Sequence, residues 1–302
     1  SITWGDSFTL ASKPFNYRVM AGIGDNTSKV TKYDNPNRTL TDPYEGQQLG
    51  EIWGYVVDGY FKTDEEARNY KVDQSFVNQM INASALDNGL HAGDLKFVDL
   101  DGNNKIEQTT SANDRKDMKV IGNSLPRYNY NFGISADWYG IDFSVLFQGI
   151  GKQNWYPGAE TSMFWGPYSR PYASFIPSDF MSQVWSEENT DAYFPRPRGY
   201  VALGSNRELA VVNTKYLQNL AYCRLKNLSI GYTLPDKWLS KIGFEKIRVY
   251  FSGENLLTFT KLHSDYIDPE QASASNSWKT SKSDANIYPW AKTYSFGVDI
   301  TF

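Results

Sequence analysis

The residue types best suited to bind a metal ion occur together between residues 99 and 105. Asp99, Asp101 and Asn103 place side-chain oxygen atoms at alternate positions, and the backbone carbonyl of Lys105 follows two residues later. A calcium-binding loop takes oxygen ligands at its first, third, fifth and seventh positions, because Ca²⁺ is a hard cation that prefers oxygen. The spacing therefore predicts a Ca²⁺ site, and the sequence requires no other cofactor.

Two positions depart from the calcium-loop pattern. Asn104 stands at the sixth position, where the sharp turn favours glycine, and Thr110 stands at the twelfth, where an acid is usual. Asp114 would supply that acid if the loop were longer. The alternative interpretation is a turn in which the Asp and Asn side chains bond to their own backbone without any ion.

A second candidate binding segment, residues 151–215, is dense in aromatic and proline residues. Aromatic rings stack on the C–H faces of sugars, and prolines stiffen a loop and so lower the entropy cost of binding. The alternative is that these rings pack a small core of the loop itself or contact a partner protein. The candidates for substrate contact are Trp155, Tyr156, Phe164, Trp165, Tyr168 and Tyr172.

No arrangement of residues indicates catalysis. The adjacent acids Glu187 and Glu188 do not give the separation of about 5–10 Å that paired glycosidase carboxylates need. The two histidines, His91 and His263, lie far apart in loop-like segments, and the single Cys223 excludes an internal disulfide and a CxxC metal site. We therefore predict that the protein performs no covalent chemistry.

Composition narrows the class of protein further. The net charge of -4 argues against nucleic-acid binding, which needs a basic surface. Aromatic residues make up 16% of the chain although its mean hydropathy is only -0.53, and no apolar run of about 18 residues predicts a transmembrane helix. Two classes fit this combination: a secreted carbohydrate-binding β protein, and a membrane barrel whose strands alternate apolar and polar residues.

Period-two alternation predicts strands in several segments. Residues 15–23 and 294–302 alternate apolar and polar side chains, and segments 128–150 and 222–259 each contain two such runs joined by a short connection. A strand face that carries charges must contact water, either in the lumen of a wide barrel or on one side of a sandwich. In the barrel interpretation, strand parity assigns these side chains to the lumen: Arg18, Asp142, Gln148, Arg248 and Glu254.

The connections are of two very different lengths. The turns at 139–140 and 235–243 are short, whereas segments 25–60, 62–117, 151–215 and 260–290 are long. Short periplasmic turns that alternate with long extracellular loops are typical of outer-membrane barrels. The eight to ten strands expected here are fewer than the about 22 of large outer-membrane transporters. We therefore expect the chain to be a C-terminal part, with other strands upstream.

Several segments, in order along the chain, resemble the SusC/RagA family of TonB-dependent transporters, and the terminal strand ending at Phe302 completes the pattern. The resemblance runs from about residue 15 to residue 302 and is specific as a set. The matching segments are GQQLGEIWGY (46–55), DGYF (58–61), GDLKFVDLDG (93–102), IGNSLPRY (121–128), RLKNLSIGY (224–232), GENLLT (253–258), DPE (268–270) and YP (288–289).

This resemblance implies an all-β fold in which residues 1–302 form the C-terminal portion of an antiparallel transmembrane β-barrel of about 22 strands. It implies a place in the outer membrane of a Gram-negative bacterium, in contact with lipid, and import of oligosaccharides or, in some relatives, peptides. A SusD-like surface lipoprotein would form a lid over the substrate, and TonB would act through an N-terminal plug that has no counterpart here. Whether two transporter–lipoprotein pairs form a dimer stays open.

Two other functions fit part of the pattern. A secreted carbohydrate-binding β module would be soluble without detergent and would fold by itself. A passive porin would share the barrel but would need neither TonB nor a plug. Neither alternative accounts for the ordered set of family segments, so TonB-dependent import is the preferred prediction.

Overall fold

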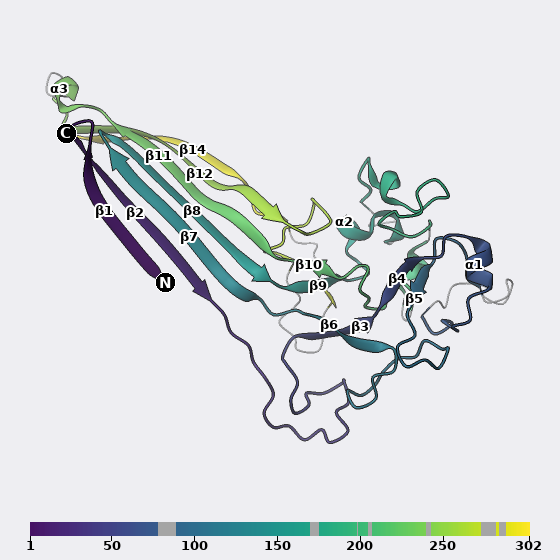
Figure 1. The fold of residues 1–302 in the computed structure, drawn as a ribbon. Coiled ribbons are helices and arrows are strands. Elements are labelled where there is room, and N and C mark those ends of the chain that lie inside the picture. The colour runs from purple at the N-terminus through teal and green to yellow at the C-terminus, as the bar shows by residue number, and fades with distance from the viewer. Residues whose placement is uncertain are drawn as a thin grey trace.

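The structure is a computed structural model that describes residues 1–77, 89–169, 175–197, 199–204, 207–239, 243–272, 282–283 and 288–302. It has two parts (Figure 1): a long antiparallel sheet, and at one end of that sheet an assembly of shorter elements. We call the second part the loop assembly; it comprises the described residues of 25–126, 153–221 and 261–292. The chain is therefore mostly β, as the periodicity predicted.

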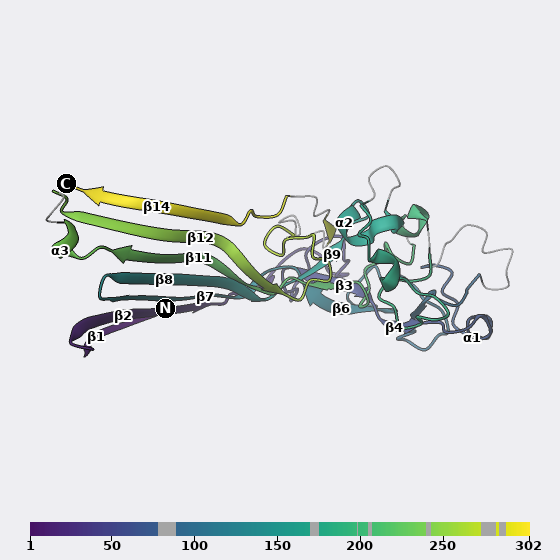
Figure 2. The same cartoon turned by 90° about the horizontal axis from the view of Figure 1, so that it is seen from above.

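Seven long strands form the main sheet, in the order β1-β2-β7-β8-β11-β12-β14. All neighbouring pairs are antiparallel. Viewed from above, the strands run side by side along the length of the sheet (Figure 2). Their bounds are β1 (Ile2–Leu10), β2 (Lys13–Gly24), β7 (Arg127–Trp138), β8 (Ile141–Lys152), β11 (Tyr222–Thr233), β12 (Lys246–Thr260) and β14 (Thr293–Thr301).

Short connections lie at one end of the sheet. Tyr139 and Gly140 join β7 to β8, and both have positive φ angles of 49° and 85°, as a two-residue type I′ hairpin requires. A side chain at Gly140 would lie 2.7 Å from the Thr233 carbonyl oxygen, so glycine is also needed for space. Helix α3 (Asp236–Leu239) joins β11 to β12 and lies at this end with the C-terminus (Figure 1). Both predicted hairpins and both single strands are confirmed.

One strand was missed by the periodicity. β1 pairs with β2 through the two-residue turn Ala11-Ser12, and Asp6 lies opposite Tyr17 on an otherwise apolar face. That acid interrupts the alternation in the sequence. Tertiary pairing with β2, together with the ring contact of Trp4 on Tyr17 at 5.4 Å between centroids, places the strand regardless.

The two faces of the main sheet differ in polarity. Directly paired residues point to the same side, so each face can be followed from strand to strand. One row across the sheet reads Arg18, Ser135, Ser144, Ser229, Ser252 and Ser295. The neighbouring row on the opposite face reads Tyr17, Ala136, Phe143, Ile230, Phe251 and Phe296. The sheet thus has a polar face and an apolar face, and the apolar one is open: Phe296 is 84% exposed.

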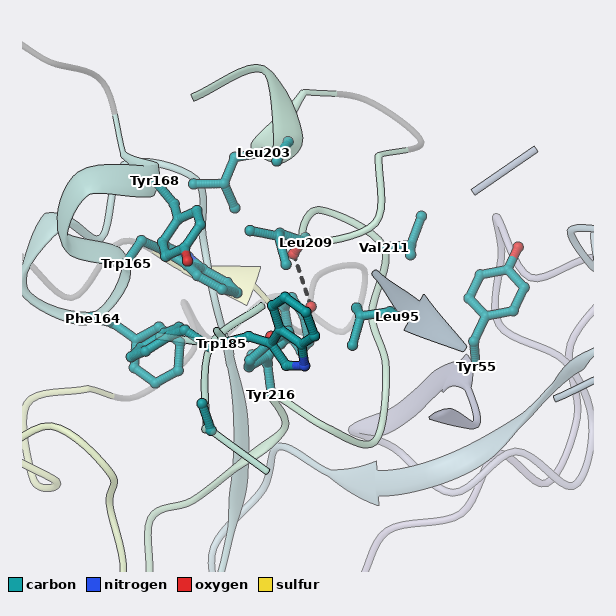
Figure 3. Close-up of a cluster of buried hydrophobic side chains, with 14 of the residues drawn as sticks. Tyr55, Leu95, Phe164, Trp165, Tyr168, Trp185, Leu203, Leu209, Val211 and Tyr216 are labelled. Atoms are coloured by element: carbon teal, nitrogen blue, oxygen red, sulfur yellow. Dashed lines mark hydrogen bonds between the residues drawn. The ribbon is translucent and has the colours of Figure 1, made fainter. Parts of the chain in front are cut away.

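The loop assembly holds the buried core. Segments expected to be long loops contain short strands and helical turns that pack around aromatic side chains (Figures 2 and 3). These elements are β3 (Glu51–Tyr55) paired with β6 (Met118–Asn123), β4 (Val57–Tyr60) paired with β5 (Leu95–Phe97), and β9 (Asn154–Pro157) between β10 (Gln218–Asn219) and β13 (Lys282–Ser283), together with α1 (Asp64–Arg68), α2 (Ser162–Trp165) and 3₁₀ turns at Gly166–Tyr168, Phe180–Gln183 and Tyr200–Leu203.

Within the described part of the chain, no helix has both the length and the apolar character needed to cross a membrane.

Candidate functional site

The polar face of the main sheet contains all five side chains that strand parity assigned to it. Arg18 lies in the serine row, and Asp142, Gln148, Arg248 and Glu254 are placed on the same face by the pairing of β8, β11, β12 and β14. Three strands lie between Arg18 on β2 and Arg248 on β12. The structure therefore confirms that these residues share a face, while their role as lumen lining stays a prediction.

An ion-pair cluster joins strands at the short-turn end of this face. Arg248 contacts Asp142 across β11 with nitrogen–oxygen distances of 2.6 and 2.8 Å, and it reaches Asp299 on β14 at 3.2 Å. Gly231 makes this possible, because a side chain there would lie 2.5 Å from the Arg248 guanidinium. The bidentate geometry fixes the relative positions of β8 and β12.

At the other end of the polar face, a buried charge network was not anticipated. Arg224 on β11 is only 3% exposed and pairs with Asp268 at 2.7 Å and Glu270 at 2.6 Å. A β-bulge after Leu225 makes Lys226 an extra residue relative to β8, and its ammonium also reaches Glu270 at 2.8 Å. The network attaches the segment after β12 to the wall of the sheet.

A cavity of about 250 Å³ lies beside this network. Arg224, Asp268, Trp290 and Lys292 are among its lining residues. The sequence offered a signal, since Arg224 and Asp268 both lie in family segments quoted above. Alternation alone could not pair them, because the bulge changes the parity of β11 and the partner acids belong to a loop.

The aromatic candidates for sugar contact do not form an accessible surface. Trp155, Tyr156, Phe164, Trp165 and Tyr168 are each at most 2% exposed and belong to the core of the loop assembly (Figure 3). Tyr172 lies outside the described residues. Stacking on a sugar needs an open ring face, which none of these five residues offers in this structure. The alternative interpretation, self-packing, is the arrangement observed.

Hydrogen bonds explain why these polar aromatic groups tolerate burial. The Tyr156 hydroxyl donates to the Leu209 carbonyl at 2.8 Å, and the Trp165 indole donates to the Gly158 carbonyl at 2.9 Å. The Tyr168 hydroxyl donates to the Pro195 carbonyl at 2.7 Å. Burial raises the pKa of the Tyr156 hydroxyl well above its ordinary value. These groups act as neutral donors that position the loops.

The predicted calcium loop folds as a tight turn whose side chains bond to its own backbone. Asp99 accepts from the Gly102 and Asn104 amides, each at 2.7 Å, and Asn103 accepts from the Lys105 amide at 2.8 Å. Asn104 has a positive φ of 62°, which explains the missing glycine, because asparagine tolerates this conformation.

Asp117, which was not among the residues predicted from the sequence, lies with Asp99 and Asp101 in a group of three carboxylates at this turn. The carboxylates of Asp99, Asp101 and Asp117 offer oxygen atoms within 4.8 Å of one another. Burial raises the pKa of the Asp117 carboxyl, which accepts from the Leu100 and Glu107 amides. Both interpretations of the loop fit this geometry, so Ca²⁺ binding stays a prediction.

Comparisons with known proteins find that the chain is similar to one part of larger receptors. No protein-family model matches it. Two proteins of Formosa agariphila are similar: TonB-dependent receptor P3, 28% identical over 316 residues, and TonB-dependent receptor P39, 25% identical over 331 residues. These alignments cover 98% and 99% of this chain but 28% and 30% of the relatives. The chain thus spans less than a third of their length.

Solved structures share the fold. The RagAB peptide importer in its open-open state aligns with a TM-score of 0.63 at 19% identity, and its closed-closed state with 0.59 at 19%. Each alignment covers 99% of this chain, and 28% or 29% of the other chain. The alignments with the solved structures therefore include both the main sheet and the loop assembly.

Proposed function

The chain fits a SusC/RagA-family TonB-dependent receptor, and from this premise we propose that it forms part of the wall and the extracellular loops of an outer-membrane transporter. The transporter imports its substrate with energy delivered by TonB. The chain contributes surfaces for substrate and partner and performs no covalent step. Its main sheet crosses the membrane, with the short turns on the periplasmic side and the loop assembly outside the cell.

The open apolar face of the main sheet is the observation that carries this proposal. Trp4, Ile23 and Phe296 are 60%, 73% and 84% exposed on it, and apolar rows extend from β1 to β14. Soluble proteins rarely expose an apolar patch larger than a few hundred Å². Lipid around this face would remove the free-energy cost of exposing apolar side chains to water. The strands, with 9 to 15 residues, are long enough, because a tilted strand needs about 9–11 residues to cross the bilayer.

The two edges of the main sheet support a larger barrel. β1 and β14 are the outermost strands and each pairs on one side only within the described residues. An open edge in lipid leaves backbone groups without hydrogen bonds at a cost of several kcal/mol each. We propose that further strands continue from both edges into a closed barrel of about 22 strands.

The substrate class is proposed to be oligosaccharides. The solved structures with this fold are named for a peptide importer, so peptides are the second candidate. The name RagAB belongs to that solved assembly. For this chain we propose a SusD-like surface lipoprotein as the partner. Exposed apolar side chains on the loop assembly support docking of a protein there: Ile176, Met181, Tyr200 and Tyr266.

Membrane fractionation and uptake together test the proposal. The chain should be recovered in outer membranes, require detergent for extraction and copurify with a lipoprotein. Uptake of its substrate should stop when the proton gradient is collapsed or TonB is removed. Uptake that persists without TonB would identify a passive porin. A species that is soluble without detergent and binds glycans alone would identify a carbohydrate-binding module instead.

A further inference from the structure

A positively charged cavity in the loop assembly is separate from the sites described above. It measures about 460 Å³ and lies between the segment before β3 and the strands β3 and β6. From its lining we propose a binding site for a carboxylate-bearing sugar unit of an acidic oligosaccharide. The lining residues used here are Arg38, Tyr44, Glu51, Trp53, Arg115 and Lys119.

Three cations face one acid in this cavity. In the described ranges of the chain, Arg38, Arg115 and Lys119 make no ion pair. Glu51, the single acid, already accepts from the Tyr44 hydroxyl at 2.6 Å and from the Gln48 amide at 3.0 Å. The cavity therefore has an excess of positive charge that no group lining it neutralises.

A buried donor without an acceptor belongs to a residue that lines the same cavity. The Arg38 Nε is buried and lacks a hydrogen-bond acceptor. The Trp53 indole nitrogen lies beside the Tyr44 hydroxyl, whose oxygen can accept a hydrogen bond while its own proton is donated to Glu51. Native structures satisfy nearly all buried polar atoms, so unsatisfied donors in a cavity indicate a missing acceptor.

The Arg38 guanidinium is held in place for such an acceptor. It stacks over the Tyr44 ring, with 4.9 Å between its central carbon and the ring centroid. A planar, fixed guanidinium presents two parallel donors, the arrangement that binds a carboxylate in bidentate fashion. Arg115 and Lys119 are exposed at the rim, so an anion can enter from solvent and be attracted before it is bound.

The volume of the cavity and the aromatic ring that lines it favour a sugar acid over a simple inorganic ion. A cavity of this volume falls within the range of about 300–1,000 Å³ that small-molecule sites occupy. Trp53 is half-buried and lines the cavity together with the cations, so one ring face and one carboxylate can be bound at once. That this sugar belongs to an imported chain rests on the proposed function; the binding itself rests on the cavity alone.

Calorimetry on the detergent-purified full-length receptor tests the binding. The probes are an oligogalacturonate and the same oligosaccharide with its carboxyl groups reduced to alcohols. The acidic probe should bind at least tenfold more tightly, and added salt should weaken only that probe, because charged contacts are screened. Equal affinity for the two probes would overturn the proposal. A peptide with a free C-terminal carboxylate that binds while the acidic sugar does not would overturn the saccharide assignment.

Variants locate the site. Arg38→Gln and Lys119→Gln should each weaken binding of the acidic probe, the first by tenfold or more and the second by about threefold, in line with losing a charged hydrogen bond or a rim charge. Because Lys119 is exposed, Lys119→Gln should leave the fold intact and still test the site if Arg38→Gln fails to fold. Lys237→Gln on α3, at the opposite end of the molecule, is the matched control and should have no effect. Unchanged affinity in both pocket variants would refute the site.

Uptake measurements distinguish a failure of the binding-site proposal from a failure of the proposed transport function. If pocket variants lose binding of the acidic probe while TonB-dependent uptake of neutral oligosaccharides continues, both proposals hold. If no TonB-dependent uptake occurs for any substrate but the acidic probe still binds through Arg38, the transport proposal fails and the cavity assignment survives.

Discussion

The main sheet and the loop assembly place their apolar side chains in opposite ways. In the sheet, aromatic and aliphatic side chains point outward and stay open, as Phe296 does at 84% exposure. In the loop assembly, rings such as Trp165 and Tyr216 are fully buried against one another. The proposed function explains the difference: a loop assembly that lies in water needs its own core, whereas a sheet that is covered by lipid does not.

Removing a ring from the core of the loop assembly should produce the largest effect. Trp165→Ala leaves a cavity and removes the edge contacts with Phe164 and Tyr216, so we expect a loss of about 3–5 kcal/mol in the stability of the loop assembly. Protease sensitivity of the extracellular loops and denaturant unfolding would measure it. Trp4→Ala on the open face of β1 is the control and should cost about 1 kcal/mol, since lipid refills the space.

Breaking the buried charge network should rank second. Arg224→Met leaves Asp268 buried without its partner, and we expect a cost of about 3 kcal/mol that is felt mainly in the segment after β12. Hydrogen exchange of residues 261–272 should increase while exchange in the main sheet stays constant. The double variant Arg224→Met with Asp268→Leu should recover much of the loss. A loss that persists undiminished in the double variant would mean that packing, and not charge, dominates.

Adjacent residues on β8 test the two faces of the sheet directly. Val145 lies on the apolar face and Ser144 on the polar face. We expect Val145→Lys to destabilise the folded protein in lipid vesicles by about 2 kcal/mol, because it places a charge against hydrocarbon. Ser144→Lys should change stability little. Equal costs at the two positions would contradict a lipid-facing apolar side.

Acidification should give the smallest effect, confined to the loop assembly. Burial lowers the pKa of His263 from its ordinary 6.5, with Asp265 opposing the shift and Lys215 adding to it. The unfolded chain therefore binds a proton more readily than the folded one, so stability should be full above pH 6.5 and fall as the pH drops below it. His263→Phe should keep the stacking on Tyr193 and flatten this dependence. Unfolding midpoints between pH 5 and 8 would measure both.

Alternation in the sequence was enough to find most of the sheet and its two faces. It located both hairpins and placed Arg18, Asp142 and Arg248 on one side, because the side-chain period of a strand is two. It failed for Arg224, where a bulge shifts the parity of β11. The aromatic composition of segment 151–215 made Trp155 and Trp165 candidates for substrate contact, because composition shows that a loop is aromatic but not which way its rings point.

What the sequence determined by itself was the strand pattern, the tight turns and the ordered family segments. Only the tertiary structure decided which loops form a core, which acids meet Arg224 and which cations gather around the cavity at Arg38. The physical reason is the range of the interactions. Alternation and turn preferences are set by neighbours along the chain, whereas burial and charge pairing join residues such as Arg224 and Asp268 that lie 44 positions apart.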